Sequence, residues 1–211
     1  MPAKGVAVPK SIGRLHVITD RLSVASAALS AGAPVIQVRC KSRTDAELYE
    51  LVCRVVELAM PMDATVVVND RLHVALAAGA HGGHVGQHDL PTAIARNVLG
   101  VDAVLGGTAR DPATAQAHEA AGASYLGVGP TFTTTSKQGL PAPLGPQRVG
   151  EVAAAVGIPV IAIAGVTADR IPELLDAGVH GVAVIGAIGD APDPYSATEE
   201  LLRVLDKAGA P

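Results

Sequence analysis

The sequence of 211 residues has almost no aromatic side chains, only two cysteines and no tryptophan. Phe, Tyr and Trp together make up 2% of the residues, so the core has to be built from Val, Ile, Leu and Ala. The shortage of rings also removes the platforms on which unpaired bases stack. A formal net charge of −4 excludes a generally basic surface. We therefore expect no nucleic-acid partner.

Long apolar runs are missing as well. No uninterrupted stretch approaches the roughly 20 apolar residues that span a bilayer, so no membrane association is expected. Residues 1–14 are too short and too interrupted by Gly and Pro for a secretory signal. The two cysteines, Cys40 and Cys53, would stay reduced in the cytosol. With 49% apolar and 17% charged residues, the composition predicts a folded cytoplasmic protein with a large core.

One pattern repeats along the whole chain: a short apolar run is followed by a helix-like segment rich in Ala, Leu and Glu. Eight such runs occur, spaced by about 20 residues, which is enough for one strand, one helix and two short loops. The predicted strands are 15–19, 35–39, 65–69, 83–87, 103–107, 125–129, 160–165 and 181–186. The predicted helices are 22–31, 45–60, 71–79, 91–98, 112–121, 147–156, 168–177 and 194–208.

Eight units of this kind favour an α/β fold in which the sheet closes as a single (β/α)8 TIM barrel, one domain over residues 1–211. The competing interpretation is an open doubly wound sheet, which usually has fewer strands and a Gly-rich first turn. Here that turn reads TDRLS, without glycine. Residues 1–13 are expected to be an N-terminal extension. The connection 130–146 is long and rich in Pro and Gly, which indicates an active-site loop.

Polar side chains gather where the predicted strands end, which in a parallel barrel is the active face. Gln37, Arg39 and Lys41 alternate along the end of the second strand and should therefore point to one side. Such a row in an apolar barrel mouth needs an anionic partner. The alternative is that a lone cation lays its stem along apolar surface and keeps its charge in solvent.

Two acidic residues, Asp70 and Asp89, follow the third and fourth strands and stand 19 residues apart, the length of one β-α unit. Both could be helix N-caps, worth about 1 kcal/mol each. Alternatively they share Mg²⁺, which takes one or two protein carboxylates and completes its shell with water and phosphate oxygens. Because the basic row lies beside them, we expect a magnesium site for a pyrophosphate. Zinc at His81, His84 and His88 is disfavoured, since no cysteine is near and the spacing falls across a strand.

A second set of anion donors is predicted after the fifth to eighth strands. Hydroxyl groups and a lysine follow the sixth strand, and small residues follow the last two, where such barrels usually bind phosphate through backbone N–H groups. The candidates are Thr108, Thr134, Thr135, Ser136, Lys137, Gly165, Ile185 and Gly186. The sequence thus predicts two anion sites, one for a monophosphate and one for a metal-held polyphosphate.

Together these motifs resemble the thiamine-phosphate synthase (thiamine-phosphate pyrophosphorylase) family over about residues 14–206: QVRCK, VND, GQHD, GVGPTFTTTSK, AIAGV and GVAVIGAI. The resemblance implies that a hydroxymethylpyrimidine diphosphate and a thiazole phosphate are joined to thiamine phosphate, with release of pyrophosphate. It implies that the pyrimidine diphosphate lies against Gln37, Arg39, Lys41, Asn69, Thr108 and Lys137, and that Arg39, Lys41 and Lys137 stabilise the leaving charge. Asp70 and Asp89 would hold Mg²⁺, and Thr134, Thr135, Ser136, Gly165, Ile185 and Gly186 would hold the thiazole phosphate.

The chain departs from the usual pattern at several positions: Thr108 replaces Ser, Arg110 replaces His, Ala164 replaces Gly, and Gly186 stands where Ser is common. Two other functions remain as alternatives. The related thiazole tautomerase needs an acid/base pair after the second and fifth strands, where this chain has Cys40 and Arg110. A catalytically silent barrel that binds thiamine intermediates would not need Mg²⁺. The sequence leaves the oligomeric state open, homo-oligomers included.

Overall fold

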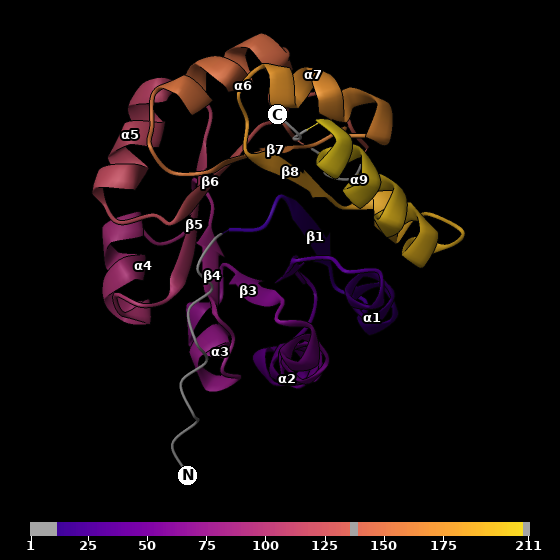
Figure 1. Cartoon of the computed structure of the whole chain (residues 1–211). Helices are drawn as coiled ribbons and strands as arrows, with labels where there is room; N and C mark the ends of the chain where they lie inside the picture. Colours follow the sequence, from indigo (N-terminus) through magenta and orange to yellow (C-terminus); the bar gives the residue numbers. More distant parts are fainter. Residues whose placement is uncertain (1–11, 136–138, 209–211) are drawn as a thin grey trace.

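In the computed structural model, which describes residues 12–135 and 139–208, eight parallel strands close into a barrel in the order of the chain (Figure 1). The strands are β1 (Leu15–Thr19), β2 (Val35–Val38), β3 (Thr65–Asn69), β4 (Gly82–Val85), β5 (Val104–Ala109), β6 (Tyr125–Val128), β7 (Val160–Ile163) and β8 (Gly181–Val184). Each strand pairs in parallel with its neighbours, and β8 pairs with β1. The predicted (β/α)8 barrel is confirmed.

Helices form the outer layer around this ring (Figure 1). They are α1 (Leu22–Ser30), α2 (Asp45–Ala59), α3 (Leu72–Ala77), α4 (Thr92–Leu99), α5 (Pro112–Ala120), α6 (Gly145–Ala154), α7 (Ile171–Asp176), α8 (Gly186–Gly189) and α9 (Pro194–Ala208), with 3₁₀ turns η1 (Met60–Met62) and η2 (Ala168–Arg170). None of the helices in the described ranges is both long and apolar enough to cross a membrane.

The structure differs from the sequence prediction mainly at the carboxyl ends of the strands. β7 and β8 end two residues before the predicted limits, because the chain turns there into the mouth of the barrel. The short helix α8 was not predicted. It starts where the last apolar run was expected to continue, and the Gly189 N–H donates to the Ile185 carbonyl oxygen at 2.7 Å. Two of its four residues are glycine, which has a low helix propensity, so the sequence gives no sign of a helix here.

Alternate strand residues divide into two apolar layers. One layer fills the inside of the barrel and consists of Ile18, Val35, Val67, Val104, Tyr125, Ile161 and Ala183. The other and larger layer lies between the strands and the helices. Since successive side chains of a strand point to opposite faces, every second residue of each strand faces the barrel interior. The same alternation then determines which side chains reach the mouth.

Several helix ends carry the expected local chemistry. Thr44 and Glu47 form a capping box at the start of α2, and Asp111 caps α5 by accepting from the Thr114 N–H at 2.9 Å. Gly32 and Gly178, which follow α1 and α7, have φ of 94° and 93°, a conformation that closes a helix and favours glycine. These ends fix the length of each β-α unit.

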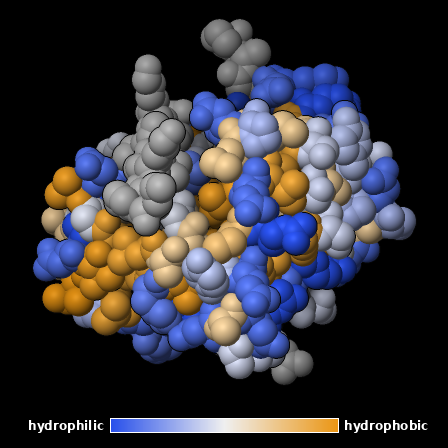
Figure 2. All heavy atoms as spheres, turned by 90° about the horizontal axis from the view of Figure 1, so that it is seen from below, coloured by the Kyte–Doolittle hydropathy of each residue, from blue (hydrophilic) through white to orange (hydrophobic). Residues whose placement is uncertain are grey.

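The outer surface is mixed in polarity, and Figure 2 shows hydrophilic and apolar side chains side by side on the face seen from below. Large apolar side chains that stay exposed include Leu76, Ile94, Val98 and Val101, on or next to α3 and α4. Exposed apolar residues are normal on folded proteins. The burial that stabilises this chain therefore comes from the two inner layers.

Arg96 near the end of α4 ties that helix to the segment before β6. Its guanidinium donates to the carbonyl oxygens of Gly100 at 2.8 Å, Ala103 at 2.7 Å and Gly122 at 2.7 Å, and to the Ser124 hydroxyl at 3.1 Å. A cation at the carboxyl end of a helix also interacts favourably with the helix dipole. One side chain thus joins two successive β-α units.

We expect Arg96→Gln to lower the free energy of unfolding by about 2–3 kcal/mol, the usual worth of hydrogen bonds from a charged group. Urea unfolding measures this loss. Arg54→Gln is the matched control, because Arg54 lies on α2 with only an exposed ion pair to Glu57, and such a change costs less than about 0.5 kcal/mol. Equal losses in the two variants would contradict the joining role of Arg96.

Candidate active site at the carboxyl ends of the strands

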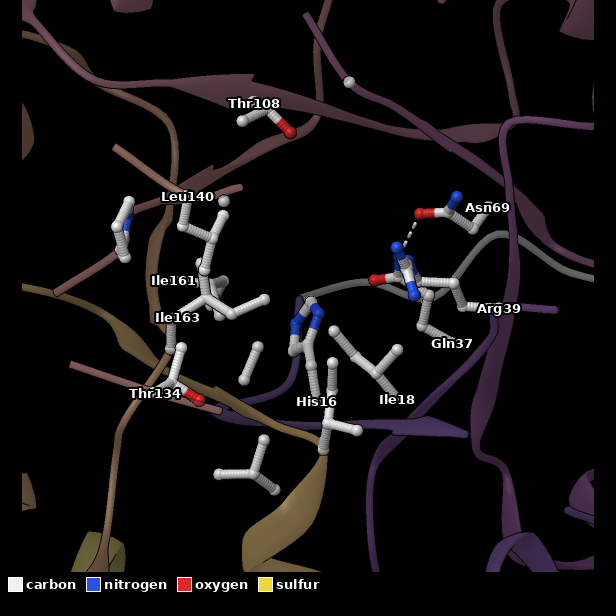
Figure 3. A pocket seen from close by; sticks show the side chains of 18 of the residues that line it. His16, Ile18, Gln37, Arg39, Asn69, Thr108, Thr134, Leu140, Ile161 and Ile163 are labelled. Atoms are coloured by element: carbon white, nitrogen blue, oxygen red, sulfur yellow. Dashed lines mark hydrogen bonds between the residues drawn. The ribbon is translucent and has the colours of Figure 1, made fainter. Parts of the chain in front are cut away.

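A cavity of about 710 Å³ lies at the carboxyl ends of the strands, and all eight strands contribute to its lining. One residue from each strand illustrates this: Ile18, Gln37, Asn69, His84, Thr108, Tyr125, Ile161 and Ala183. In Figure 3 the polar side chains of Gln37, Arg39 and Asn69 lie on one side, and Leu140, Ile161, Ile163 and Thr134 lie on the other. The cavity thus has a strongly polar wall that faces a more apolar one.

The basic row predicted after β2 reaches this cavity. Gln37, Arg39 and Lys41 all line it, as their alternation requires. Gln37 is buried, and its amide donates to the Asn69 Oδ1 at 2.9 Å, which fixes both side chains (Figure 3). Among the described residues, neither Arg39 nor Lys41 forms an ion pair with a carboxylate. Two positive charges at the mouth are therefore available to an anionic ligand.

The two predicted acids, Asp70 and Asp89, line the same cavity, and neither caps a helix. α3 begins after Arg71 and α4 after Pro91, without a side-chain hydrogen bond at either start. The Asp89 carboxylate accepts instead from the Gly86 N–H at 2.7 Å. Asp70 has φ of 62°, which is unusual for a residue with a side chain. The interpretation of these acids as helix caps is therefore wrong.

The two carboxyl groups lie close enough to change one another's ionisation. Burial raises the pKa of Asp70 to about 6, and the hydrogen bond and charge of Asp89 act in the same direction, while Lys41 and Arg39 oppose them. A shared cation would remove this repulsion. In the described part of the chain no three His, Cys, Asp or Glu side chains form a group that could hold a metal. Two carboxylates alone fit Mg²⁺, whose other ligands are commonly water and phosphate oxygens.

On the opposite side of the cavity the lining is mostly uncharged and rich in backbone, with Asp190 after α8 as an acidic exception. Thr134, Thr135, Gly165, Ile185 and Gly186 all line the cavity there. Gly165 has φ of 68°, and a Cβ at this position would lie 2.6 Å from the Thr133 carbonyl oxygen. No larger residue fits without moving the turn. This wall can offer N–H groups and hydroxyls to a second anion.

The turn after β7 is held from outside the cavity. Arg170 donates to the Gly165 carbonyl oxygen at 2.6 Å, and its guanidinium lies 4.5 Å from the centroid of the Phe132 ring. The Phe132 N–H donates in turn to the Ala164 carbonyl oxygen at 3.0 Å. Ala164, which stands where the family pattern has glycine, takes φ of 75° here. These contacts hold a strained turn in one conformation.

Inside the barrel, His84 bridges two other polar side chains. Its Nδ1 lies 3.1 Å from the Tyr125 hydroxyl and its Nε2 lies 2.9 Å from the Thr108 Oγ1. Burial lowers the pKa of His84 to about 4 and raises the pKa of Tyr125, so both groups are neutral at neutral pH. Gly106 makes the room, because a Cβ there would lie 2.3 Å from both the His84 Nδ1 and the Tyr125 Cζ.

The predicted loop 130–146 contributes part of the cavity wall. Leu140 lines the cavity, and Arg110 at the end of β5 donates to the Ala142 carbonyl oxygen at 2.9 Å. Ser136 and Lys137 lie outside the described residues. The other predicted site residues all line this one cavity: Gln37, Arg39, Lys41, Asn69, Asp70, Asp89, Thr108, Thr134, Thr135, Gly165, Ile185 and Gly186.

Among the lining residues of the barrel interior that the sequence interpretation missed are three with ring side chains: His16, His84 and Tyr125. His84 was weighed only as a zinc ligand. The alternation could have identified it, because His84 stands two residues before Gly86 and both face the cavity. His81 is turned elsewhere, and its Nδ1 accepts from the Val66 N–H at 3.0 Å.

The chain is similar to known proteins over almost its whole length. Thiamine-phosphate synthase of Salinispora tropica is 57% identical over 204 residues, which covers 92% of this chain and 98% of that protein. The thiamine-phosphate synthase of Salinispora arenicola is 54% identical over 204 residues, with the same coverage. Among solved structures, thiamine phosphate pyrophosphorylase from Pyrococcus furiosus matches with a TM-score of 0.86 at 34% identity, covering 93% of this chain and 97% of that one.

A sequence profile described as thiamine monophosphate synthase matches residues 13–188. This range contains all eight strands and the two acidic residues at the mouth. The chain belongs to the thiamine monophosphate synthase family.

Proposed function

We propose that this chain condenses 4-amino-5-hydroxymethyl-2-methylpyrimidine diphosphate with a thiazole phosphate, giving thiamine phosphate and pyrophosphate in thiamine biosynthesis. The observation that carries the proposal is the pairing of two walls in one cavity. One wall combines the cations Arg39 and Lys41 with the acids Asp70 and Asp89, and the other is a neutral cradle around Gly165. This arrangement suits one substrate with a diphosphate and one with a monophosphate, and the relatives carry names of the same activity.

The reaction needs little proton transfer. The bond between the pyrimidine methylene carbon and the diphosphate oxygen breaks, and its electron pair leaves with pyrophosphate. The thiazole ring nitrogen then forms a bond to the same carbon with its own electron pair and becomes positively charged. No proton has to move for this exchange to balance. What the protein has to supply is stabilisation of the leaving charge and alignment of the two rings.

The polar wall serves the leaving group in this proposal. Arg39 and Lys41 place unpaired positive charge where the diphosphate lies, which favours the more highly charged leaving group over the bound substrate. Asp70 and Asp89 would hold Mg²⁺. When bound, the ion would neutralise part of the charge on the departing pyrophosphate. Lys137 has the same assigned role, although it lies outside the described residues.

The neighbouring amide pair and the opposite wall position the two substrates. Gln37 and Asn69, fixed by their mutual hydrogen bond, present amide donors and acceptors to the pyrimidine. Thr134, Thr135, Ser136, Gly165, Ile185 and Gly186 are assigned to the thiazole phosphate. The apolar side chains Ile161 and Ile163 line the cavity on the same side as Thr134 (Figure 3). Flat rings can pack there while their phosphates reach opposite rims.

The alternative activities find less support. The tautomerase needs an acid/base pair at the positions that Cys40 and Arg110 occupy in this chain. Cys40 is buried in the layer between strands and helices, so of these two residues only Arg110 lines the cavity. A silent binding barrel has no use for an acid such as Asp70, whose pKa is raised by burial and by the neighbouring Asp89. Both features favour the synthase.

The direct test is release of pyrophosphate from the purified chain. With both substrates and Mg²⁺ we expect pyrophosphate and thiamine phosphate in equal amounts, and none of either when one substrate is omitted. Chelation of divalent ions should stop the reaction, and added Mg²⁺ should restore it. Absence of turnover with both substrates present would overturn the proposed function.

Asp70→Asn should lower the rate and raise the metal-free stability. The raised pKa means that the folded protein holds this proton more tightly than the unfolded chain, so the carboxyl group costs stability as pH rises from about 4 through about 6. At pH 8 without metal, thermal unfolding should show a Tm higher by roughly 2–4 °C. The rate should fall roughly 10²- to 10³-fold, and Mg²⁺ should raise the Tm of the unsubstituted protein but not that of the Asp70→Asn variant.

Asp45→Asn is the matched control, because this exposed acid accepts from Arg71 and His73 and the pKa of Asp45 is lowered, chiefly by His73. It should lose stability above its ordinary pKa, keep its rate and keep the response to Mg²⁺. A lower Tm with a near-normal rate in Asp70→Asn would contradict the metal role of Asp70.

Gly165→Ala should impair binding of the thiazole phosphate specifically. The added Cβ meets the Thr133 carbonyl oxygen and the turn has to move, so we expect KM for the thiazole phosphate to rise between roughly 10- and 100-fold. KM for the pyrimidine diphosphate should stay the same in steady-state kinetics. Gly100→Ala is the control, because Gly100 has φ of 84° with nothing within 4 Å of the added atom. A parallel rise in both Michaelis constants would count against the two-wall arrangement.

A further inference from the structure

Tyr125, His84 and Thr108 form a hydrogen-bonded chain that runs from the barrel interior towards the cavity mouth. All three line the cavity, but Tyr125 is 1% exposed and His84 is 9% exposed, whereas Thr108 is half-buried (Figure 3). Tyr125 is level with Gly106 in the β5–β6 pairing, and Thr108 is one inward position closer to the carboxyl end. The chain therefore connects a buried phenol deep in the barrel with a more exposed hydroxyl nearer the mouth.

The direction of the hydrogen bonds in this chain follows from burial. A neutral imidazole carries one N–H and accepts at its other nitrogen. In the described part of the chain, the Tyr125 hydroxyl has no hydrogen-bond partner other than the His84 Nδ1, at 3.1 Å. If it did not donate there, its proton would be buried without an acceptor, which is costly. Tyr125 therefore donates to Nδ1, and the ring proton of His84 stands on Nε2.

This tautomer decides what the Thr108 hydroxyl can do. The His84 Nε2–H donates to the Thr108 Oγ1 across 2.9 Å, so the oxygen is used as an acceptor and its own hydrogen remains free to donate. No second partner for this hydroxyl occurs among residues 12–135 and 139–208. With the opposite tautomer Thr108 would donate to the ring and could offer only an oxygen to the cavity. An anionic ligand needs the donor.

The backbone of Thr108 is held from the other side of the strand. Its carbonyl oxygen lies 3.0 Å from the His118 Nε2, and because a carbonyl only accepts, that nitrogen carries the proton. The His118 Nδ1 then accepts from the Thr92 hydroxyl, at 2.6 Å. Two histidines with the same tautomer thus hold one residue, one at its side chain and one at its main chain.

Two glycines in neighbouring strands make room for the His84 ring, at a cost in packing. Gly106 and Gly127 leave the space that His84 occupies, since a Cβ at Gly127 would lie 3.2 Å from the His84 Cε1. Glycine inside a strand weakens it, and the apolar cluster inside the barrel is otherwise made of aliphatic side chains. A purely structural filling would not need a polar network with defined proton positions.

We propose that Tyr125 and His84 are positioning residues that fix the Thr108 hydroxyl as a hydrogen-bond donor to the pyrimidine diphosphate. The identity of this ligand rests on the proposed function. The relay itself rests on the distances and burial given above. In this proposal Thr108 donates to the substrate, and the other two act through it.

A double-mutant cycle tests the relay. Thr108→Val removes the donor and should lower kcat/KM for the pyrimidine diphosphate roughly 10- to 100-fold. Tyr125→Phe releases the ring from its tautomer and should lower it roughly tenfold. In the Thr108→Val background the same Tyr125→Phe change should cost less than about twofold, because the relay then has nothing to act on. Equal losses in both backgrounds would overturn the proposal.

Thr198→Val is the matched control. It also removes a buried hydroxyl, one that donates to the Pro194 carbonyl oxygen at 2.7 Å in α9, away from the cavity. We expect a lower Tm and unchanged kcat/KM. This separates the kinetic effect of the relay from a loss of stability alone.

The tautomer of His84 has a readout that does not depend on turnover. Long-range ¹H–¹⁵N correlation spectra of the unsubstituted protein should show His84 protonated at Nε2 and bare at Nδ1, and this readout stays decisive if the Tyr125→Phe protein does not fold. A ring protonated at Nδ1 would overturn the relay alone. Absence of pyrophosphate release from the unsubstituted protein would overturn the proposed function, and the two failures are thereby distinguished.

Discussion

The closure of eight parallel strands into one ring is the constraint on which the rest of this molecule depends, because it assigns every strand residue to one of two environments. Val38 packs against the helices, while its neighbours Gln37 and Arg39 face the cavity. The register places Gln37 beside Ile18 on one side and Val67 on the other, all three facing inward. A slip of one residue would exchange the two sets. The active face and the core are thus determined by the same pairing.

The ring is not filled uniformly. Aliphatic side chains from β1 to β3 and from β7 to β8 occupy most of the interior, whereas β4 to β6 leave room with glycine for His84 and Tyr125. The chain has a single phenylalanine, no tryptophan and three tyrosines. One of these tyrosines, Tyr125, lies here, and its hydroxyl is hydrogen-bonded to His84. Buried polar networks of this kind are stable only when each member is paired. The inside of the barrel therefore serves both packing and the orientation of groups at the mouth.

Much of the fold could be predicted because it depends on local patterns. The apolar runs, their alternation and the glycines after helices indicate the strands, the inward residues and the helix ends. α8 could not be predicted, since its four residues have no helical pattern and form a turn only because β8 ends at the rim. The sequence also could not separate a capping role from a site role for Asp70 and Asp89, as an acid before a helix looks the same in both cases. The distinction depends on a tertiary contact: the Asp70 N–H donates to the His84 carbonyl oxygen on β4 at 2.9 Å.

That contact explains why the acidic pair exists in its present form. It draws the end of β3 against β4 and leaves Asp70 with φ of 62°, a conformation that costs about 1 kcal/mol in a residue with a Cβ. The carboxyl group is then held close to Asp89, which adds electrostatic repulsion to the strain. Within the described part of the chain, neither Asp70 nor Asp89 caps a helix or forms an ion pair in return for these costs. Such an arrangement is understandable when the two carboxylates are held ready for a cation, because a preorganised site needs no rearrangement on binding. The position that this contact gives Asp70 thus accounts for its positive φ and places its carboxyl group where burial, and then Asp89, raises its pKa.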